Sequence, residues 1–73
     1  MGRRKKDFVE VLLARDIEIL QRLAGGEEYK QISDSMDLHL NTMYQSMYRV
    51  MRVLKVANKT QAVAEALRQD LID

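Results

Sequence analysis

The apolar residues between positions 38 and 59 recur with the period of an α-helix. Met43, Met47, Val50 and Leu54 follow one another at steps of four, three and four residues, which places all four on one face. The other face carries amide, aromatic and basic side chains: Asn41, Tyr44, Gln45, Tyr48, Arg49 and Arg52. The pattern predicts a helix over residues 40–54 with one side packed on a core and an acid-free side exposed.

The stretch before this helix predicts another long helix. Asp7 and Glu10 have the spacing of a capping box, and apolar residues then recur up to the pair Gly25 and Gly26. Either glycine can adopt the left-handed conformation that ends a helix. We therefore expect a first helix over residues 8–24.

Two shorter helices complete the prediction. Apolar residues at helical spacing predict a second helix over residues 29–36, followed by a tight turn at Asp37 and Leu38. Thr60 is a suitable N-cap for a last helix over residues 61–69. No stretch alternates with period two, so we expect an all-α fold without a sheet. Four helices with a tight turn between the second and the third predict a helix-turn-helix domain.

The length of 73 residues suits one small domain, which we place at residues 7–73 after a flexible basic arm over residues 1–6. The chain has no cysteine and only one histidine, His39, so we expect no disulfide, no metal site and no cofactor. No apolar run approaches the roughly 20 residues of a membrane span. We expect a cytoplasmic protein that does not contact a membrane. We also expect that it is not an enzyme, because a core this small leaves no substrate pocket of the usual volume of roughly a few hundred Å³.

The net charge of +1 conceals a strong segregation of charge along the chain. Residues 1–6 carry four basic side chains, and residues 7–37 carry eight acids against three bases. Residues 38–64 then carry four bases and no acid. Such segregation favours a cationic surface that attracts a polyanion, although basic side chains that only solvate an exposed helix are the alternative.

These features occur together in a known family. The chain from about residue 12 to residue 72 resembles the LuxR-type, or GerE-type, helix-turn-helix domain of bacterial transcription regulators. The stretch NKTQAVAEAL, which starts at Asn58, carries the most specific part of the resemblance. The other matching stretches lie at residues 15–20, 23–26, 29–32, 42–43 and 54–56.

The resemblance implies binding to double-stranded DNA, usually as a homodimer, with the helix over residues 40–54 in the major groove. RNA polymerase is a further candidate partner. The resemblance places a dimer contact on the last helix, here at Ala62, Val63, Ala66, Leu67 and Asp70. DNA contacts are expected from Lys30, Asn41, Thr42, Tyr44, Gln45, Tyr48, Arg49, Arg52, Lys55, Asn58, Lys59 and Thr60.

The chain also departs from the family pattern at several positions. The Thr-Pro pair that usually opens the first helix is Leu13-Ala14 here, which would let that helix extend back toward Asp7. The usual serine cap of the recognition helix is His39, its usual lysine is Tyr44 and its usual histidine is Ser46. The lysine and glycine that usually flank Leu54 are Val53 and Lys55.

Each candidate side chain suggests a particular role on DNA. Gln45 and Asn41 can each form paired hydrogen bonds with adenine, worth about 1–3 kcal/mol of discrimination. Tyr44 and Tyr48 can donate to phosphates or lie against thymine methyl groups, or pack over the rim of the core. The basic side chains are best read as phosphate contacts, with solvated surface charge as the alternative: Lys30, Arg49, Arg52, Lys55 and Lys59.

Two functions remain open at this point. The first is a sequence-specific DNA-binding transcription regulator, or the effector domain of one. The alternative is a helix-turn-helix module that dimerises or titrates another regulator without binding DNA itself. Tyr44 in place of a lysine, an exposed Met51 and the low net charge favour the alternative.

Overall fold

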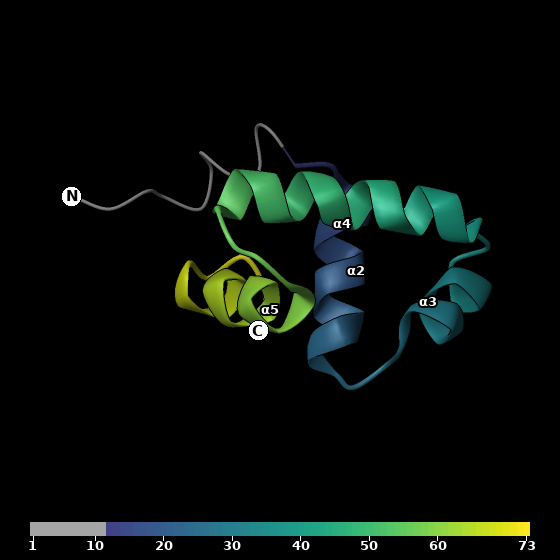
Figure 1. Cartoon of the computed structure of the whole chain (residues 1–73). Coiled ribbons are helices and arrows are strands. Elements are labelled where there is room, and N and C mark those ends of the chain that lie inside the picture. Colours follow the sequence, from purple (N-terminus) through teal and green to yellow (C-terminus); the bar gives the residue numbers. More distant parts are fainter. Residues whose placement is uncertain (1–11) are drawn as a thin grey trace.

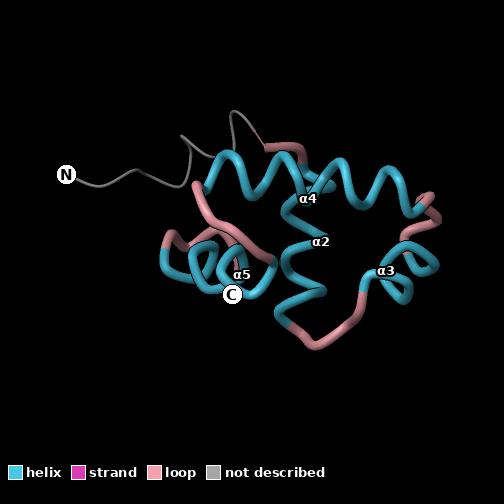
Figure 2. The backbone as a smooth tube through the Cα atoms, in the orientation of Figure 1, coloured by secondary structure: helices cyan, strands magenta, loops and turns pink. Residues whose placement is uncertain are grey.

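A computed structural model describes residues 12–73, and within that range it contains four helices and no strand. The helices are α2 (Ala14–Ala24), α3 (Tyr29–Ser35), α4 (Leu40–Leu54) and α5 (Lys59–Arg68). In Figure 1, α4 lies across the other three helices, and α2 crosses beneath it between α5 and α3. The backbone tube in Figure 2 shows that short loops make all the connections. The all-α helix-turn-helix prediction is confirmed.

The first described helix begins later than the sequence pattern predicts. Leu13 is extended, with φ −83° and ψ 156°, and α2 begins at Ala14. The carboxylate of Asp16 accepts a hydrogen bond of 2.9 Å from the Leu13 N–H, which fixes the chain at the helix entrance. The expected continuous helix over residues 8–24 is therefore wrong at Leu12 and Leu13. The Asp7 cap, the segment over residues 8–11 and the basic arm lie outside the described residues.

All four helices end in the same way. The residue after each last turn has a positive φ, and the next N–H donates to a carbonyl five residues earlier in a Schellman motif. The left-handed residues are Gly26 (φ 97°), Asp37 (φ 55°), Lys55 (φ 58°) and Asp70 (φ 60°). Only one of the four is a glycine, although a Cβ makes this conformation unfavourable.

The last helix is capped by Asn58 and not by Thr60. The Asn58 side chain accepts a hydrogen bond of 2.9 Å from the Gln61 N–H, so α5 begins at Lys59. Thr60 lies one position inside the helix and is exposed. Asparagine and threonine are both good caps, so the choice between them depended on the path of the loop.

The core lies where the four helices meet. Met43, Met47, Val50 and Leu54 of α4 are all buried, which confirms the predicted inner stripe of this helix. They pack with fully buried side chains of the other helices: Ile19, Leu20, Ile32, Ala62 and Ala66.

The end of the chain also belongs to the core. Leu71 and Ile72 follow α5 and are 4% and 6% exposed. Gln21 of α2 holds Asp73 in place, because its Nε2 donates to the Asp73 backbone oxygen at 3.2 Å and its Oε1 accepts from the Asp73 N–H at 3.1 Å. Residues 71–73 therefore pack beside α2, two through buried side chains and the third through backbone hydrogen bonds.

Candidate nucleic-acid interface

The outward face of α4 is the most distinctive surface of the described chain. Because the apolar stripe of this helix is buried, its periodicity turns Asn41, Tyr44, Gln45, Tyr48 and Arg52 outward, and all five are exposed. Tyr44 and Tyr48 remain 52% and 62% exposed, which is unusual for large aromatic side chains in a small domain. The predicted exposed face is therefore present.

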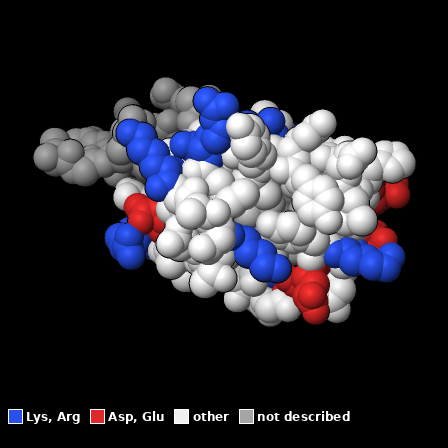
Figure 3. Space-filling model, in the orientation of Figure 1, with Lys and Arg blue, Asp and Glu red and all other residues white. Residues whose placement is uncertain are grey.

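Basic side chains flank this face, and α4 itself carries no acid. Figure 3 shows blue side chains gathered over the C-terminal half of α4, while the rest of the helix surface in this view is uncharged. Arg52 lies on that half, Lys55 follows directly after α4, Lys59 begins α5, and all three are exposed. Lys30 of α3 is also exposed, with Asp34 at 3.8 Å from its Nζ, and a contact between such exposed groups is weak. Cations from three helices thus border the outward face of α4.

Arg49 is half-buried and bound to α2, in contrast to the exposed residues of this face. Its Nε and Nη2 donate to the two carboxylate oxygens of Asp16 at 2.8 and 3.0 Å, and its side chain is only 34% exposed. Asp16 itself has no exposed surface. Two of the three guanidinium nitrogens of Arg49 are therefore engaged with the α2 carboxylate, so Arg49 is not a simple solvated surface charge. A phosphate contact through its third nitrogen stays a prediction.

Asp16 stays ionised although it is buried. Burial raises its pKa, but the hydrogen bonds from Arg49, the Leu13 N–H and Ser46, together with the Arg49 charge, lower the pKa below its ordinary value of 3.8. Ser46 has no exposed surface, and its Oγ accepts from Nε of Arg15 at 3.2 Å. The cluster of Arg15, Asp16, Ser46 and Arg49 joins the first turn of α2 to the middle of α4.

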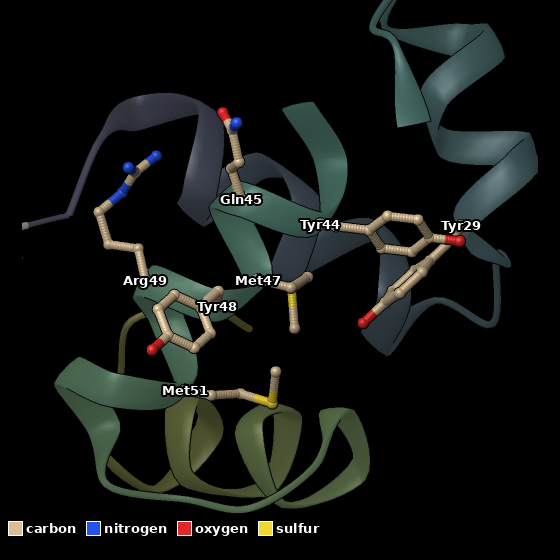
Figure 4. Close-up of a pocket in the computed structure, with 7 residues that line it drawn as sticks. All are labelled: Tyr29, Tyr44, Gln45, Met47, Tyr48, Arg49 and Met51. Atoms are coloured by element: carbon tan, nitrogen blue, oxygen red, sulfur yellow. The ribbon is translucent and has the colours of Figure 1, made fainter. Parts of the chain in front are cut away.

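A groove opens between α4 and the start of α3. It has a volume of about 690 Å³ and is lined mostly by apolar and aromatic groups: Tyr29, Tyr44, Gln45, Met47, Tyr48, Arg49 and Met51. In Figure 4, Met47 lies between the tyrosines at the base, Met51 and Tyr48 lie on one side, and Tyr44 faces Tyr29 on the other. The groove therefore gives the outward face of α4 an apolar half beside its cationic half.

Aromatic contacts hold this groove in shape. The rings of Tyr29 and Tyr44 meet edge to face with centroids 5.7 Å apart. Nζ of Lys59 lies 4.8 Å from the Tyr29 ring centre, and the Arg52 guanidinium lies 5.6 Å from that of Tyr48. Such contacts are worth about 0.5–1 kcal/mol at exposed sites. Burial, with a smaller contribution from Tyr44, raises the pKa of Tyr29 above its ordinary value of 10.0, so the Tyr29 ring stays neutral in the groove wall.

The comparison with known families decides what kind of domain this is. Residues 10–66 match the model of the family described as "Bacterial regulatory proteins, luxR family". The chain belongs to this luxR family. The family is one of regulatory proteins and not of enzymes.

Individual luxR family relatives agree with this assignment. The chain is 36% identical over 63 residues to the "Probable transcriptional regulatory protein NarL" of Mycobacterium tuberculosis, in strains CDC 1551 and H37Rv alike. The match covers 86% of this chain but only 29% of the relative, so the chain spans less than a third of the length of these curated relatives. The solved "Structure of Transcription factor, GerE" superposes with a TM-score of 0.81 at 27% identity, covering 86% of this chain and 94% of that one.

The luxR family pattern placed the remaining candidate residues on two different surfaces. Asn58 and Lys59 are exposed near the groove, with the Asn58 side chain engaged in its helix cap, and Thr42 of α4 is half-buried. The dimer candidates lie on α5 and just after it: Leu67 is 43% exposed, Val63 is half-buried, and Asp70, which follows the helix, is exposed.

Two of the dimer candidates are wrong as direct contacts. Ala62 and Ala66 have no exposed surface, because their small side chains let α5 approach the core of its own chain. A partner could contact this helix only through its outer residues.

Three members of the buried cluster, Arg15, Asp16 and Ser46, were missed as functional positions. A serine on the inward side of an otherwise apolar helix stripe was the one available signal, because a buried hydroxyl requires a hydrogen-bond partner. No helix among the described residues is long and apolar enough to cross a membrane, and within the same range no group of side chains is arranged to hold a metal ion.

Proposed function

We propose that this luxR family domain binds double-stranded DNA in a sequence-specific manner to regulate transcription, with α4 in the major groove. The observation that carries the proposal is the outward face of α4, which is free of acids and bordered by cations from three helices. A B-DNA major groove admits one α-helix, and its phosphates line both sides of the helix that enters. The relatives, a probable transcriptional regulatory protein and a transcription factor, support the same function.

Each exposed residue has a role in this proposal. Asn41 and Gln45 would contact base edges from the middle of the outward face. The phosphate contacts would come from Lys30, Arg52, Lys55 and Lys59, with Asn58, Thr60 and Thr42 as neutral donors beside them. Arg49 would contribute at most one nitrogen, since Asp16 engages the other two.

The same proposal includes a homodimer formed through the outer side of α5. Val63, Leu67 and Asp70 are the residues that such a contact would use, and Leu67 is the large exposed apolar side chain there. A symmetric dimer would place two copies of α4 on two half-sites of an operator. We place this activity in the bacterial cytoplasm, where RNA polymerase is the further partner that a transcription regulator could contact.

Salt dependence tests the proposal directly. Four phosphate contacts per protomer should make the logarithm of the affinity fall by about 3.6 for each tenfold rise in salt concentration, from about 0.9 per contact. Arg52→Gln should reduce this slope by about one contact and weaken binding to all sequences alike. Arg22→Gln is the matched control, because Arg22 lies on α2 and pairs with Glu18 at 2.9 Å. An affinity that does not respond to salt would contradict the proposal.

A second candidate function rests on the groove beside Tyr44. The apolar, aromatic groove on the outward face of α4 could instead receive a protein, and the domain would then titrate another regulator without binding DNA. This alternative expects purified protein to select no sequence from a random DNA pool at any salt concentration. Enrichment of a defined sequence would exclude it.

A further inference from the structure

We infer that the operator of this protein is rich in A·T base pairs, and that the groove along α4 receives the 5-methyl groups of thymines. The inference rests on the proposed DNA binding and adds the class of sequence that is bound. Three features of the α4 surface carry it: the chemistry of the groove, the position of the amides and the engagement of Arg49.

The apolar part of the groove suits the thymine methyl group better than any other group that a base presents in the major groove. Its walls are tyrosine rings and methionine side chains, and its volume of about 690 Å³ lies on the face that would meet the base edges. The thymine 5-methyl is the one apolar group that the four bases present in the major groove. Tyr44 and Tyr48 keep more than half of their surface exposed in the free protein, so a methyl group would bury apolar area that water now covers.

The amide side chains beside the groove suit the partner base. Gln45 contributes to the groove wall, and Asn41 lies one turn earlier on the same outward face. Glutamine and asparagine can each pair with N6 and N7 of adenine through two hydrogen bonds. An amide next to an apolar groove can therefore read both members of an A·T pair.

Neither arginine of α4 is placed to contact guanine from within the groove. The usual contact is an arginine or lysine that reaches O6 and N7 with two hydrogen bonds. Arg49, the arginine at the centre of α4, directs its Nε and Nη2 at Asp16 instead. Arg52 lies over the Tyr48 ring in the last turn of the helix, where it borders the groove and does not occupy it.

Charge favours DNA over a protein segment as the occupant. Arg52, Lys55 and Lys59 border the groove and the adjoining surface, and the chain has no acid between Asp37 and Glu65. The major groove of A·T-rich DNA has phosphates along both edges and thymine methyl groups between them. This arrangement is complementary to the apolar groove of α4 with basic side chains around it.

The test compares thymine with deoxyuridine, which lacks only the 5-methyl group. Sequences bound by the full chain are first selected from a random duplex pool, and each thymine of the selected site is then replaced singly by deoxyuridine. We expect an A·T-rich site in which one or two replacements weaken binding about fourfold each, the value for one buried methyl group. Because this comparison uses the unaltered protein, it does not depend on how a variant folds.

Two variants assign the contact to the groove. Tyr44→Ala should bind the thymine and deoxyuridine sites equally at the affected position, whereas Tyr44→Phe should keep the fourfold difference because the ring remains. Loss of the difference in both variants would mean that the hydroxyl acts on a phosphate, which would overturn the assignment to the ring.

The remaining outcomes separate the inference from the proposed function. A G·C-rich site, or an A·T-rich site that tolerates deoxyuridine at every position, would overturn the inference and leave DNA binding intact. Failure to select any sequence would overturn both. A protein that occupies the groove and loses affinity with Tyr44→Ala, while DNA binding stays unchanged, would also refute the assignment of the groove to thymine.

Discussion

The ion pair between Asp16 and Arg49 leads to the sharpest prediction. Arg49→Met keeps most of the aliphatic stem of the side chain but removes the charge and both hydrogen bonds to Asp16. The carboxylate is then left in a site with no exposed surface. The sequence pattern predicts a phosphate contact at Arg49, and the ion pair adds that its loss should also lower the free energy of unfolding.

The size of the effect follows from the burial of the two partners. Removing one member of a buried pair costs about 3–5 kcal/mol, and we expect about 3 kcal/mol because the Arg49 side chain is 34% exposed and is partly screened by water. A chain of 73 residues has a free energy of unfolding of about 4–11 kcal/mol. The substitution should therefore remove a large fraction of the total stability.

Urea denaturation followed by circular dichroism measures this loss. With a slope of about 1–3 kcal/mol per molar, the midpoint should fall by roughly 1–3 M. Arg52→Met is the matched control on the same helix, because Arg52 is exposed and its guanidinium lies over the Tyr48 ring instead of a buried carboxylate. It should cost about 0.5–1 kcal/mol. Combining Arg49→Met with Asp16→Asn should cost clearly less than the sum of the two single changes.

The pH dependence checks the same reasoning independently. The pKa of Asp16 is lowered in the folded state, so its contribution to stability is present above about pH 4 and is lost as the pH falls through the lowered pKa. The difference between the wild-type protein and Arg49→Met should therefore be largest near neutral pH and should shrink on acidification. A cost below about 1 kcal/mol at neutral pH, or a difference that does not change with pH, would refute the account of this pair.

Three further predictions concern helix ends. Lys55 has a φ of 58°, which a glycine adopts without strain, so Lys55→Gly should raise the free energy of unfolding by about 1 kcal/mol. Lys55→Ala keeps a Cβ and should give no such gain. Equal thermal stabilities of the two variants would contradict this prediction. Asn58→Ala should cost about 1 kcal/mol in urea denaturation and Thr60→Ala almost nothing, and the reverse order would restore Thr60 as the cap. Gly26 has a φ of 97°, so Gly26→Ala should lower the melting temperature clearly more than Gly25→Ala. A larger effect at Gly25 would show that packing, and not backbone conformation, determines the cost of adding a Cβ at these positions.

The spacing of apolar residues along the chain was sufficient to predict α4. Its inner stripe, its outward face and its bounds at residues 40–54 all follow from apolar periodicity over four turns. The same spacing predicted the start of α2 too early, because Leu12 and Leu13 continue the apolar pattern. In the structure the Asp16 carboxylate accepts a hydrogen bond from the Leu13 N–H, and Leu13 is extended. A helix start depends on one hydrogen bond, which an apolar pattern does not encode.

The parts of the candidate site that could not be predicted all depend on contacts between distant residues. Asp16 and Arg49 are separated by 33 positions, and Arg15 and Ser46 by 31. Nothing in the local sequence of α4 distinguishes Arg49, which is paired, from Arg52, which is exposed. The same limit applies to α5, where Ala62 and Leu67 were assigned to one dimer surface although the fold buries the first and exposes the second.

The anchored end of the chain has a practical consequence for anyone who isolates this domain. The family match stops at residue 66, and α5 stops at Arg68, so either boundary looks like a natural place to trim. A fragment cut there would lose Leu71 and Ile72, each of which contributes about 1.5–3 kcal/mol by its burial. The smallest autonomous folding unit therefore includes the short tail beyond the final helix, and shortened versions would yield misleadingly weak or aggregated material.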